Sequence, residues 1–252
     1  MLTRQSTRLK ITNTAAFLTV LIVNSLANTL PINGQTTGEI SDRLPVLFTP
    51  AGYVFSIWGV IYFLFFLWTA KQFLAKPTEE HIYAKAGYWF AISSFFNVSW
   101  LFLFHYERFN LTIFAMMGLW ISLFILYSRI TALEERSFLL RFPVSVYLGW
   151  VSVALVVNIG VFFVTNGINE FLFSGELWTA FVICGVIYAS ILFMRKMNDQ
   201  TFPLVFVWAL FGIFIGRVEE APLVGWSAAA ASFLLLIFVL ARFRKKRTIN
   251  SF

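Results

Sequence analysis

Residues 142–164 read FPVSVYLGWVSVALVVNIGVFFV and contain no Asp, Glu, Lys, Arg or His. A charge-free stretch of this length meets the requirement of about 20 residues for an α-helix that crosses the hydrocarbon core of a bilayer. The whole chain has the same character, since 59% of its 252 residues are hydrophobic and only 12% are charged. So few polar side chains cannot cover the surface of a water-soluble fold. The sequence therefore predicts an integral membrane protein.

Seven further stretches share this charge-free character, which predicts an all-α polytopic membrane protein with about eight transmembrane helices. The spans are Ile11–Leu30, Ala51–Thr69, Ala86–Phe104, Leu111–Tyr127, Phe142–Val164, Leu177–Met194, Phe202–Gly216 and Leu223–Ala241. The seventh is the weakest because it is short for a full crossing. The longest non-apolar stretch, Pro31–Thr49, follows the first span and is either a lid over an outward-facing cavity or a plain connector.

The basic residues indicate how the spans are oriented. With a cytoplasmic N-terminus, sixteen of the nineteen Lys and Arg residues fall on the cytoplasmic side, and only Arg43, Arg108 and Arg217 fall outside. The acidic residues show no such asymmetry, as the positive-inside rule requires. We therefore predict a multi-pass protein of the plasma (cell) membrane with N- and C-termini in the cytoplasm.

The first span has a second interpretation. Its basic leader and the sequence Ser25-Leu26-Ala27 also suit a signal peptide with its cleavage site. Asn24 and Asn28 lie one helical turn apart, however, and suit a helix packed in a bundle. We favour a retained helix.

The residue types missing from the spans exclude several classes of function. Proton-coupled carriers, pumps and voltage sensors need ionisable groups at depth, and the eight spans contain none. His81 and His105 lie at opposite ends of the third span, so both are predicted to be interfacial residues and not a metal pair. The single cysteine, Cys184, excludes an internal disulfide. We expect no metal, no catalytic group and no nucleic-acid partner.

Tryptophan residues divide into two sets. Trp68, Trp89, Trp178 and Trp226 lie near span ends, where an interfacial aromatic belt explains them. The deeper set, Trp58, Trp100, Trp120, Trp150 and Trp208, needs partners for the indole N–H groups, because an unpaired polar group in hydrocarbon is costly.

Helical spacing places several of the deeper aromatic residues on stripes with polar side chains. The stripes are Ser93, Asn97 and Trp100 in the third span, Trp150, Ala154 and Asn158 in the fifth, and Trp58 and Tyr62 in the second. If they converge, they form a flat, mostly apolar cavity with a few hydrogen-bonding groups, which suits a planar aromatic ligand. Helix packing with bridging asparagines explains the same spacing and is the simpler interpretation of the spacing alone.

Three segments resemble the TspO/translocator protein family, the tryptophan-rich sensory proteins. They are LFTPAGYVFSIWGVIY at 47–62, NVSW at 97–100 and RFPVSVYLGW at 141–150, which leads on to Asn158. The resemblance covers roughly residues 11–166. It divides the chain into a TspO-like five-helix membrane bundle in residues 1–170 and three additional transmembrane helices with a basic cytoplasmic tail in residues 171–252. The chain is thus similar to a longer membrane branch of the family.

The sequence departs from the family pattern at several positions. Only Pro50 remains of a proline pair, and Phe162 stands where the family often has tryptophan. The cholesterol-recognition pattern, a tyrosine followed by a basic residue, is missing between Asn158 and Asn169. Sterol binding at that position is therefore not expected.

The resemblance implies a membrane binding or sensory protein for a planar hydrophobic ligand of the tetrapyrrole (porphyrin) class. Carried over by motif, the ligand-binding residues are Trp58, Tyr62, Asn97, Trp100, Trp150 and Asn158, with Pro50 shaping a lid. It implies the lipid bilayer and a small hydrophobic ligand as partners, a homodimer, and no required cofactor besides the protoporphyrin-like ligand itself. Some bacterial relatives are associated with porphyrin breakdown, but we do not expect an enzyme here.

Two other classes of function fit the composition. A non-ion-coupled transporter for a neutral or amphipathic small molecule, built on all eight helices, is the main alternative. A structural or regulatory subunit whose last three helices dock a partner is the other.

Overall fold

The computed structural model describes residues 2–30, 32–75, 80–132, 138–168 and 174–249, and these residues contain helices and no strand. The helices are α1 (Leu2–Thr29), α2 (Thr37–Asp42), α3 (Ile57–Leu74), α4 (Glu80–Ala86), α5 (Trp89–His105), α6 (Phe109–Thr131), α7 (Phe138–Thr165), α8 (Gly175–Met197), α9 (Thr201–Arg217) and α10 (Pro222–Ile249). Two 3₁₀ turns, η1 (Ile32–Gly34) and η2 (Gly52–Ser56), lie between α1 and α3.

The described helices account for the predicted spans. Helices α1, α3, α6, α7, α8 and α10 are long and apolar enough to cross a membrane. Helices α5 and α9 are apolar but shorter, at 17 residues each. At 1.5 Å per residue each is roughly 26 Å long, slightly less than the hydrocarbon thickness of about 30 Å. The prediction of an all-α polytopic membrane protein is confirmed.

Two of the α-helices begin later than the predicted spans. The predicted span from Ala86 breaks at Gly87, whose φ of +62° belongs to the left-handed region, so α5 begins at Trp89. The predicted span from Ala51 begins as the 3₁₀ turn η2 and becomes α-helical only at Ile57. Both differences lie at span ends, where hydrophobicity continues past the helix and carries no information on the boundary.

Contacts divide the chain into two compact units. The first consists of Met1–Leu44 and Ile57–Asn158, and the second of Pro45–Ser56 and Ile159–Phe252. The predicted domain boundary between residues 170 and 171 lies outside the described residues and stays a prediction.

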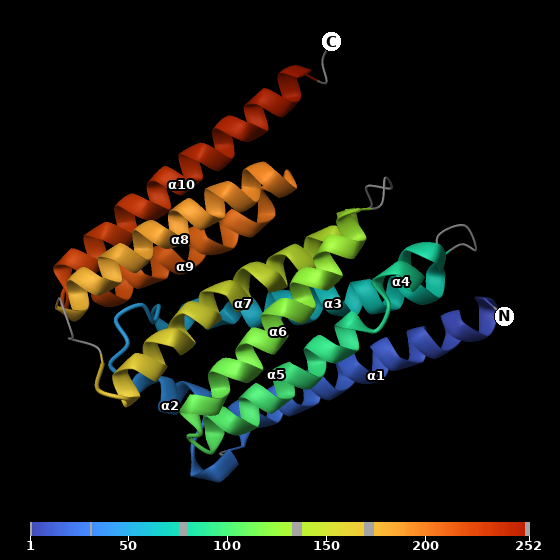
Figure 1. The fold of residues 1–252 in the computed structure, drawn as a ribbon, viewed down its shortest axis with the longest axis horizontal. Coiled ribbons are helices and arrows are strands. Elements are labelled where there is room, and N and C mark those ends of the chain that lie inside the picture. Colours follow the sequence, from blue (N-terminus) through green and yellow to red (C-terminus); the bar gives the residue numbers. More distant parts are fainter. Residues whose placement is uncertain (1, 31, 76–79, 133–137, 169–173, 250–252) are drawn as a thin grey trace. The chain divides into compact units, whose positions relative to one another are not determined.

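In the first unit, α5 packs along α6 and α1 packs along α5 (Figure 1). Leucines at the centre, among them Leu101, Leu119 and Leu123, are at most 2% exposed. Gly118 on α6 lies against the ring of Phe96 on α5, where a β-carbon would overlap the ring. A small residue at a helix contact allows close approach, which is how membrane helices gain packing energy without a hydrophobic driving force.

Trp68 does not belong to the interfacial belt in which its sequence position had placed it. It is 1% exposed and lies inside the first unit, with ring centroids 5.9 Å from Phe65, 5.4 Å from Phe90 and 5.9 Å from Tyr83. The sequence gives only how near Trp68 lies to the end of the span. It does not show that the ring faces α4 and α5. Trp226, by contrast, is 62% exposed.

In the second unit, α8, α9 and α10 lie side by side (Figure 1). Gly225 near the start of α10 allows the turn after α9 to fold back closely, since a β-carbon there would lie 2.6 Å from Cα of Val218. Asn198 ends α8 in the left-handed conformation, with φ of 51°, which asparagine tolerates better than most residues.

Candidate ligand-binding site

The predicted aromatic residues on α3 and α7 lie together in one cluster. Trp58 stacks on Tyr62 with ring centroids 5.7 Å apart, and it makes edge-to-face contacts with Trp150 and Tyr147 at centroid distances of 6.3 Å and 5.9 Å. Edge-to-face pairs are favourable because the positive ring edge meets the negative ring face. Trp150 is 2% exposed, while Trp58 and Tyr62 are half-buried. The structure therefore brings three of the predicted site residues into contact.

Asn97 joins this cluster through a chain of hydrogen bonds across three helices. Asn24 Nδ2 on α1 donates to Asn97 Oδ1 on α5 at 2.8 Å, and Asn97 Nδ2 donates to the hydroxyl of Tyr147 on α7 at 3.0 Å. All three side chains are at most 5% exposed. Two of the four hydrogen-bonding positions of the Asn97 amide are thus used within the protein.

Trp100 and Asn158 form a second predicted pair. The indole Nε1–H of Trp100 on α5 donates to Asn158 Oδ1 on α7 at 3.0 Å, and Asn158 Nδ2 donates to the Ala154 carbonyl at 3.3 Å. Trp100 also stacks on Phe104, with centroids 5.0 Å apart. The indole has the partner that its depth in the membrane requires.

A narrow cavity lies beside the aromatic cluster. Its lining comes from α1, α3, α5 and α7 and consists of Phe17, Val20, Ile61, Tyr62, Phe65, Phe90, Ser94 and Tyr147. It has room for about one water molecule, whereas pockets for drug-sized ligands measure roughly 300–1,000 Å³. The ring stripes therefore pack against each other in this conformation, and a planar ligand would have to separate them.

Pro50 belongs to the second unit, so its predicted role in a lid stays a prediction. Its segment is attached to α9: Ala51 N–H donates to the Gly212 carbonyl at 3.1 Å, and Trp208 Nε1–H donates to the Val54 carbonyl at 3.1 Å. Gly212 has no β-carbon to collide with Val54, which allows this close approach. The C-terminal helices thus hold part of the segment that carries the first family motif.

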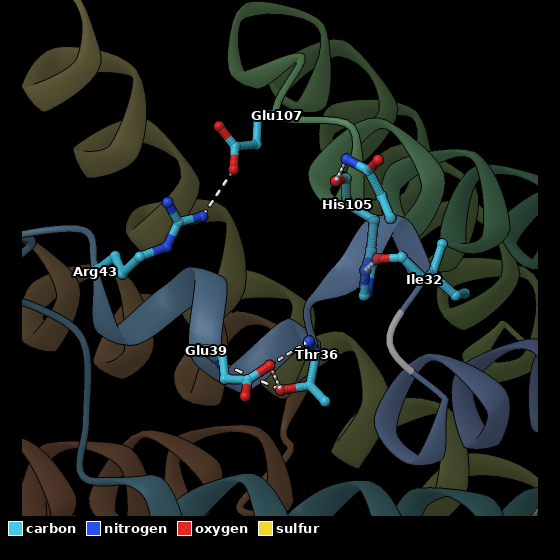
Figure 2. A network of polar contacts seen from close by, with 7 residues as sticks. Ile32, Thr36, Glu39, Arg43, His105 and Glu107 are labelled. Carbon is cyan, nitrogen blue, oxygen red and sulfur yellow. Dashed lines mark hydrogen bonds and ion pairs between the residues drawn. The ribbon is translucent and has the colours of Figure 1, made fainter.

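His105 anchors the loop that follows α1. It is 1% exposed, and its Nδ1 lies 3.2 Å from the Ile32 carbonyl (Figure 2). Its Nε2 lies 2.9 Å from the Thr37 hydroxyl. A carbonyl only accepts, so Nδ1–H donates to Ile32, while Nε2 and the Thr37 hydroxyl form the second hydrogen bond of the ring. Asn33 Nδ2 donates to the backbone carbonyl of His105 at 3.0 Å. The predicted interfacial histidine is thus a buried connector between two chain segments.

Charged side chains in the same loop make local contacts at its surface. Arg43 and Glu107 form an ion pair at 2.7 Å, and Thr36 and Glu39 form a reciprocal capping box at the start of α2 (Figure 2). Hydrogen bonds from the backbone N–H and then the hydroxyl of Thr36 hold the pKa of the Glu39 carboxyl below its ordinary value. Exposed ion pairs contribute little to stability, so His105 is the stronger anchor.

Comparison with known families shows to which family the chain belongs. A family model described as TSPO-like protein matches residues 10–241. The chain belongs to the TSPO-like protein family. The match continues through α8 and α9 and into α10 as far as residue 241, beyond the roughly 150 residues of the motif resemblance, so these helices are part of the TSPO-like chain. Comparison with curated proteins and with solved structures gave no match.

Two residues of this TSPO-like site were not predicted to contact it. Asn24 was assigned to bundle packing, and its contact with Asn97, 73 residues away, is invisible in the sequence. Tyr147 lies inside the quoted segment RFPVSVYLGW and one helical turn before Trp150. That spacing places both on one face of α7 and could have identified Tyr147.

Proposed function

We propose that this TSPO-like membrane protein binds a planar hydrophobic ligand of the tetrapyrrole class at the cluster of Trp58, Tyr62 and Trp150. The observation that carries the proposal is the convergence of these broad rings beside the buried Asn97 and Tyr147 pair. A mostly apolar wall with a few placed hydrogen-bonding groups is the usual composition of a small-molecule site. The resemblance to tetrapyrrole-binding TspO proteins supports the ligand class.

Binding at this cluster requires the rings to part. Each edge-to-face contact, such as that between Trp58 and Trp150, contributes about 0.5–1.5 kcal/mol beyond its buried area. A porphyrin ring inserted between them would replace these contacts with larger stacked surfaces. Stacking on the ligand would thus offset the ring contacts that are lost when the cluster opens.

Protoporphyrin IX tests this function directly. We expect it to quench the tryptophan fluorescence of the detergent-solubilised protein, and we expect Trp150→Phe to weaken its affinity about threefold to tenfold, the effect of losing one good ring contact. Trp226→Phe is the matched control, because Trp226 is exposed on α10, and it should leave the affinity unchanged. Absence of quenching in the wild type, or equal affinities of the wild type and Trp150→Phe, would refute the site. A Soret-type absorbance band in the purified protein would support it independently.

We also propose that the protein lies in the cell membrane with both termini on the cytoplasmic side, because sixteen of the nineteen basic residues then lie on that side. Single cysteines introduced at Arg43 and Lys71, in a Cys184→Ser background, distinguish the two orientations. A membrane-impermeant maleimide added to intact cells should label the cysteine at 43 and spare the one at 71. The reverse pattern would contradict the proposed orientation.

A further inference from the structure

Two hydrogen bonds link α1 through α5 to α7, and one backbone carbonyl determines which atom donates in each of them. Asn24 Nδ2 lies 2.9 Å from the carbonyl oxygen of Val20 and 2.8 Å from Asn97. A carbonyl can only accept, so the Asn24 atom at this position must be the amide nitrogen. The Asn97 atom that it contacts must then be the acceptor Oδ1.

The orientation of Asn97 determines the role of Tyr147. With Oδ1 turned to Asn24, the Nδ2 group of Asn97 faces the Tyr147 hydroxyl at 3.0 Å and donates to it. The phenolic oxygen therefore accepts this bond, and its own hydrogen points elsewhere. Among the residues that the structure describes, none accepts a hydrogen bond from that hydroxyl.

The free hydroxyl hydrogen belongs to a side chain that lines the cavity. Tyr147 is 4% exposed and shares the cavity wall with Tyr62, Phe65 and Phe90. An O–H group without an acceptor in a low-dielectric interior loses the hydrogen bond it would make in water, so an acceptor atom that enters the cavity gains an interaction there. The lining holds two other hydroxyl groups: that of Ser94 already donates to the Phe90 carbonyl at 2.9 Å, and that of the half-buried Tyr62 is the competing donor.

We propose that the Tyr147 hydroxyl donates a hydrogen bond to a carbonyl or carboxyl oxygen of the bound ligand. The site then selects planar apolar molecules that carry an acceptor over those that do not. Asn97 and Asn24 are positioning residues, because they keep the phenolic oxygen occupied as an acceptor and turn its hydrogen away from the Asn97 amide. The location of the site rests on the proposed function, whereas the donor role of Tyr147 rests on the hydrogen-bond geometry.

A matched pair of probes isolates this donor. 9-Fluorenone and fluorene are planar tricyclic molecules that differ by a carbonyl oxygen in place of a CH₂ group. We expect the ratio of fluorenone affinity to fluorene affinity to be about threefold to tenfold higher in the wild type than in Tyr147→Phe. This is the range for one neutral hydrogen bond. Tyr62→Phe removes the competing donor and should keep the fluorenone preference that Tyr147→Phe loses. Tyr147→Phe should leave fluorene affinity unchanged, which also shows that the variant is folded. Tyr188→Phe removes an exposed hydroxyl on α8 and should change neither affinity.

The positioning role has its own readouts. Asn24→Leu should reduce the fluorenone preference in the wild-type background and have no further effect on it in Tyr147→Phe, which is the signature of coupling through one group. In the infrared spectrum, the carbonyl stretch of bound fluorenone should shift to lower wavenumber in the wild type and return in Tyr147→Phe.

The outcomes separate this inference from the proposed function. An unshifted carbonyl stretch in the wild type, equal probe ratios in the wild type and Tyr147→Phe, or no binding of fluorenone would each overturn the donor role. Protoporphyrin binding could persist in all three cases and would then leave the proposed function standing. A fluorenone preference without protoporphyrin binding would retain the donor and reject the tetrapyrrole class.

Discussion

Replacing Gly225 by valine should lower the free energy of unfolding by roughly 3 kcal/mol or more, the upper part of the range for overpacked sites. A β-carbon on Gly225 would lie 2.6 Å from Cα and 2.8 Å from N of Val218. Both are backbone atoms, so no side-chain rotation can relieve the overlap. The turn after α9 has to move, and the packing of α10 on α9 is lost with it. Thermal unfolding in detergent, followed by circular dichroism, measures the change.

Gly185→Val on α8 is the control for this prediction. No atom lies within 4 Å of the position that its β-carbon would occupy, so valine enters open space. Because glycine is the poorer helix former, the substitution should leave stability within about 0.5 kcal/mol or raise it slightly. Equal losses in the two variants would mean that the close turn at Gly225 is not the cause.

Trp68→Ala should cost roughly 3 kcal/mol of stability, near the lower end of the range for buried aromatic residues. Trp68 is 1% exposed and contacts three other rings, so its removal leaves a cavity that the surrounding helices fill only in part. The bilayer weakens the hydrophobic contribution, since lipid chains are as apolar as the interior, but the lost packing contacts remain. Chemical or thermal unfolding of the purified variant in detergent checks the value.

Trp226→Ala is the matched control, since it removes the same side chain from an exposed position on α10. Its ring contacts Phe214 at 5.4 Å, so we expect a loss below about 1 kcal/mol. A large loss in this variant, with a small loss in Trp68→Ala, would restore the interfacial interpretation of Trp68.

The transmembrane helices were predictable because lipid imposes one strong rule. Each chain segment in hydrocarbon must satisfy its backbone hydrogen bonds internally, so charge-free stretches of sufficient length become helices. Helices α6, α7 and α8 accordingly enclose the predicted spans. The starts of α5 after Gly87 and of α3 after η2 were not predictable from hydrophobicity. The local backbone conformation, and not apolar character, sets these two boundaries.

The candidate site was predictable only where its contacts run along one helix. Trp58 and Tyr62 are one turn apart, and their stacking follows from that spacing. The contact of Trp58 with Trp150 joins two helices, and neither sequence position indicates which way the other ring faces. The attachment of the segment around Ala51 to Gly212 on α9 was likewise invisible, since it depends on two backbones approaching each other.

The amino-acid sequence by itself determined that the chain crosses a membrane, which stretches cross it and which family motifs it carries, because these properties depend on composition and on local spacing. Only the tertiary structure decided that Asn97 is held between Asn24 and Tyr147, that Trp68 is enclosed, and that the cavity is nearly filled. The reason is physical: hydrogen-bond direction and ring packing depend on which faces of distant helices meet, and in lipid the pairing of helices is set by shape and polar contacts that no single segment contains.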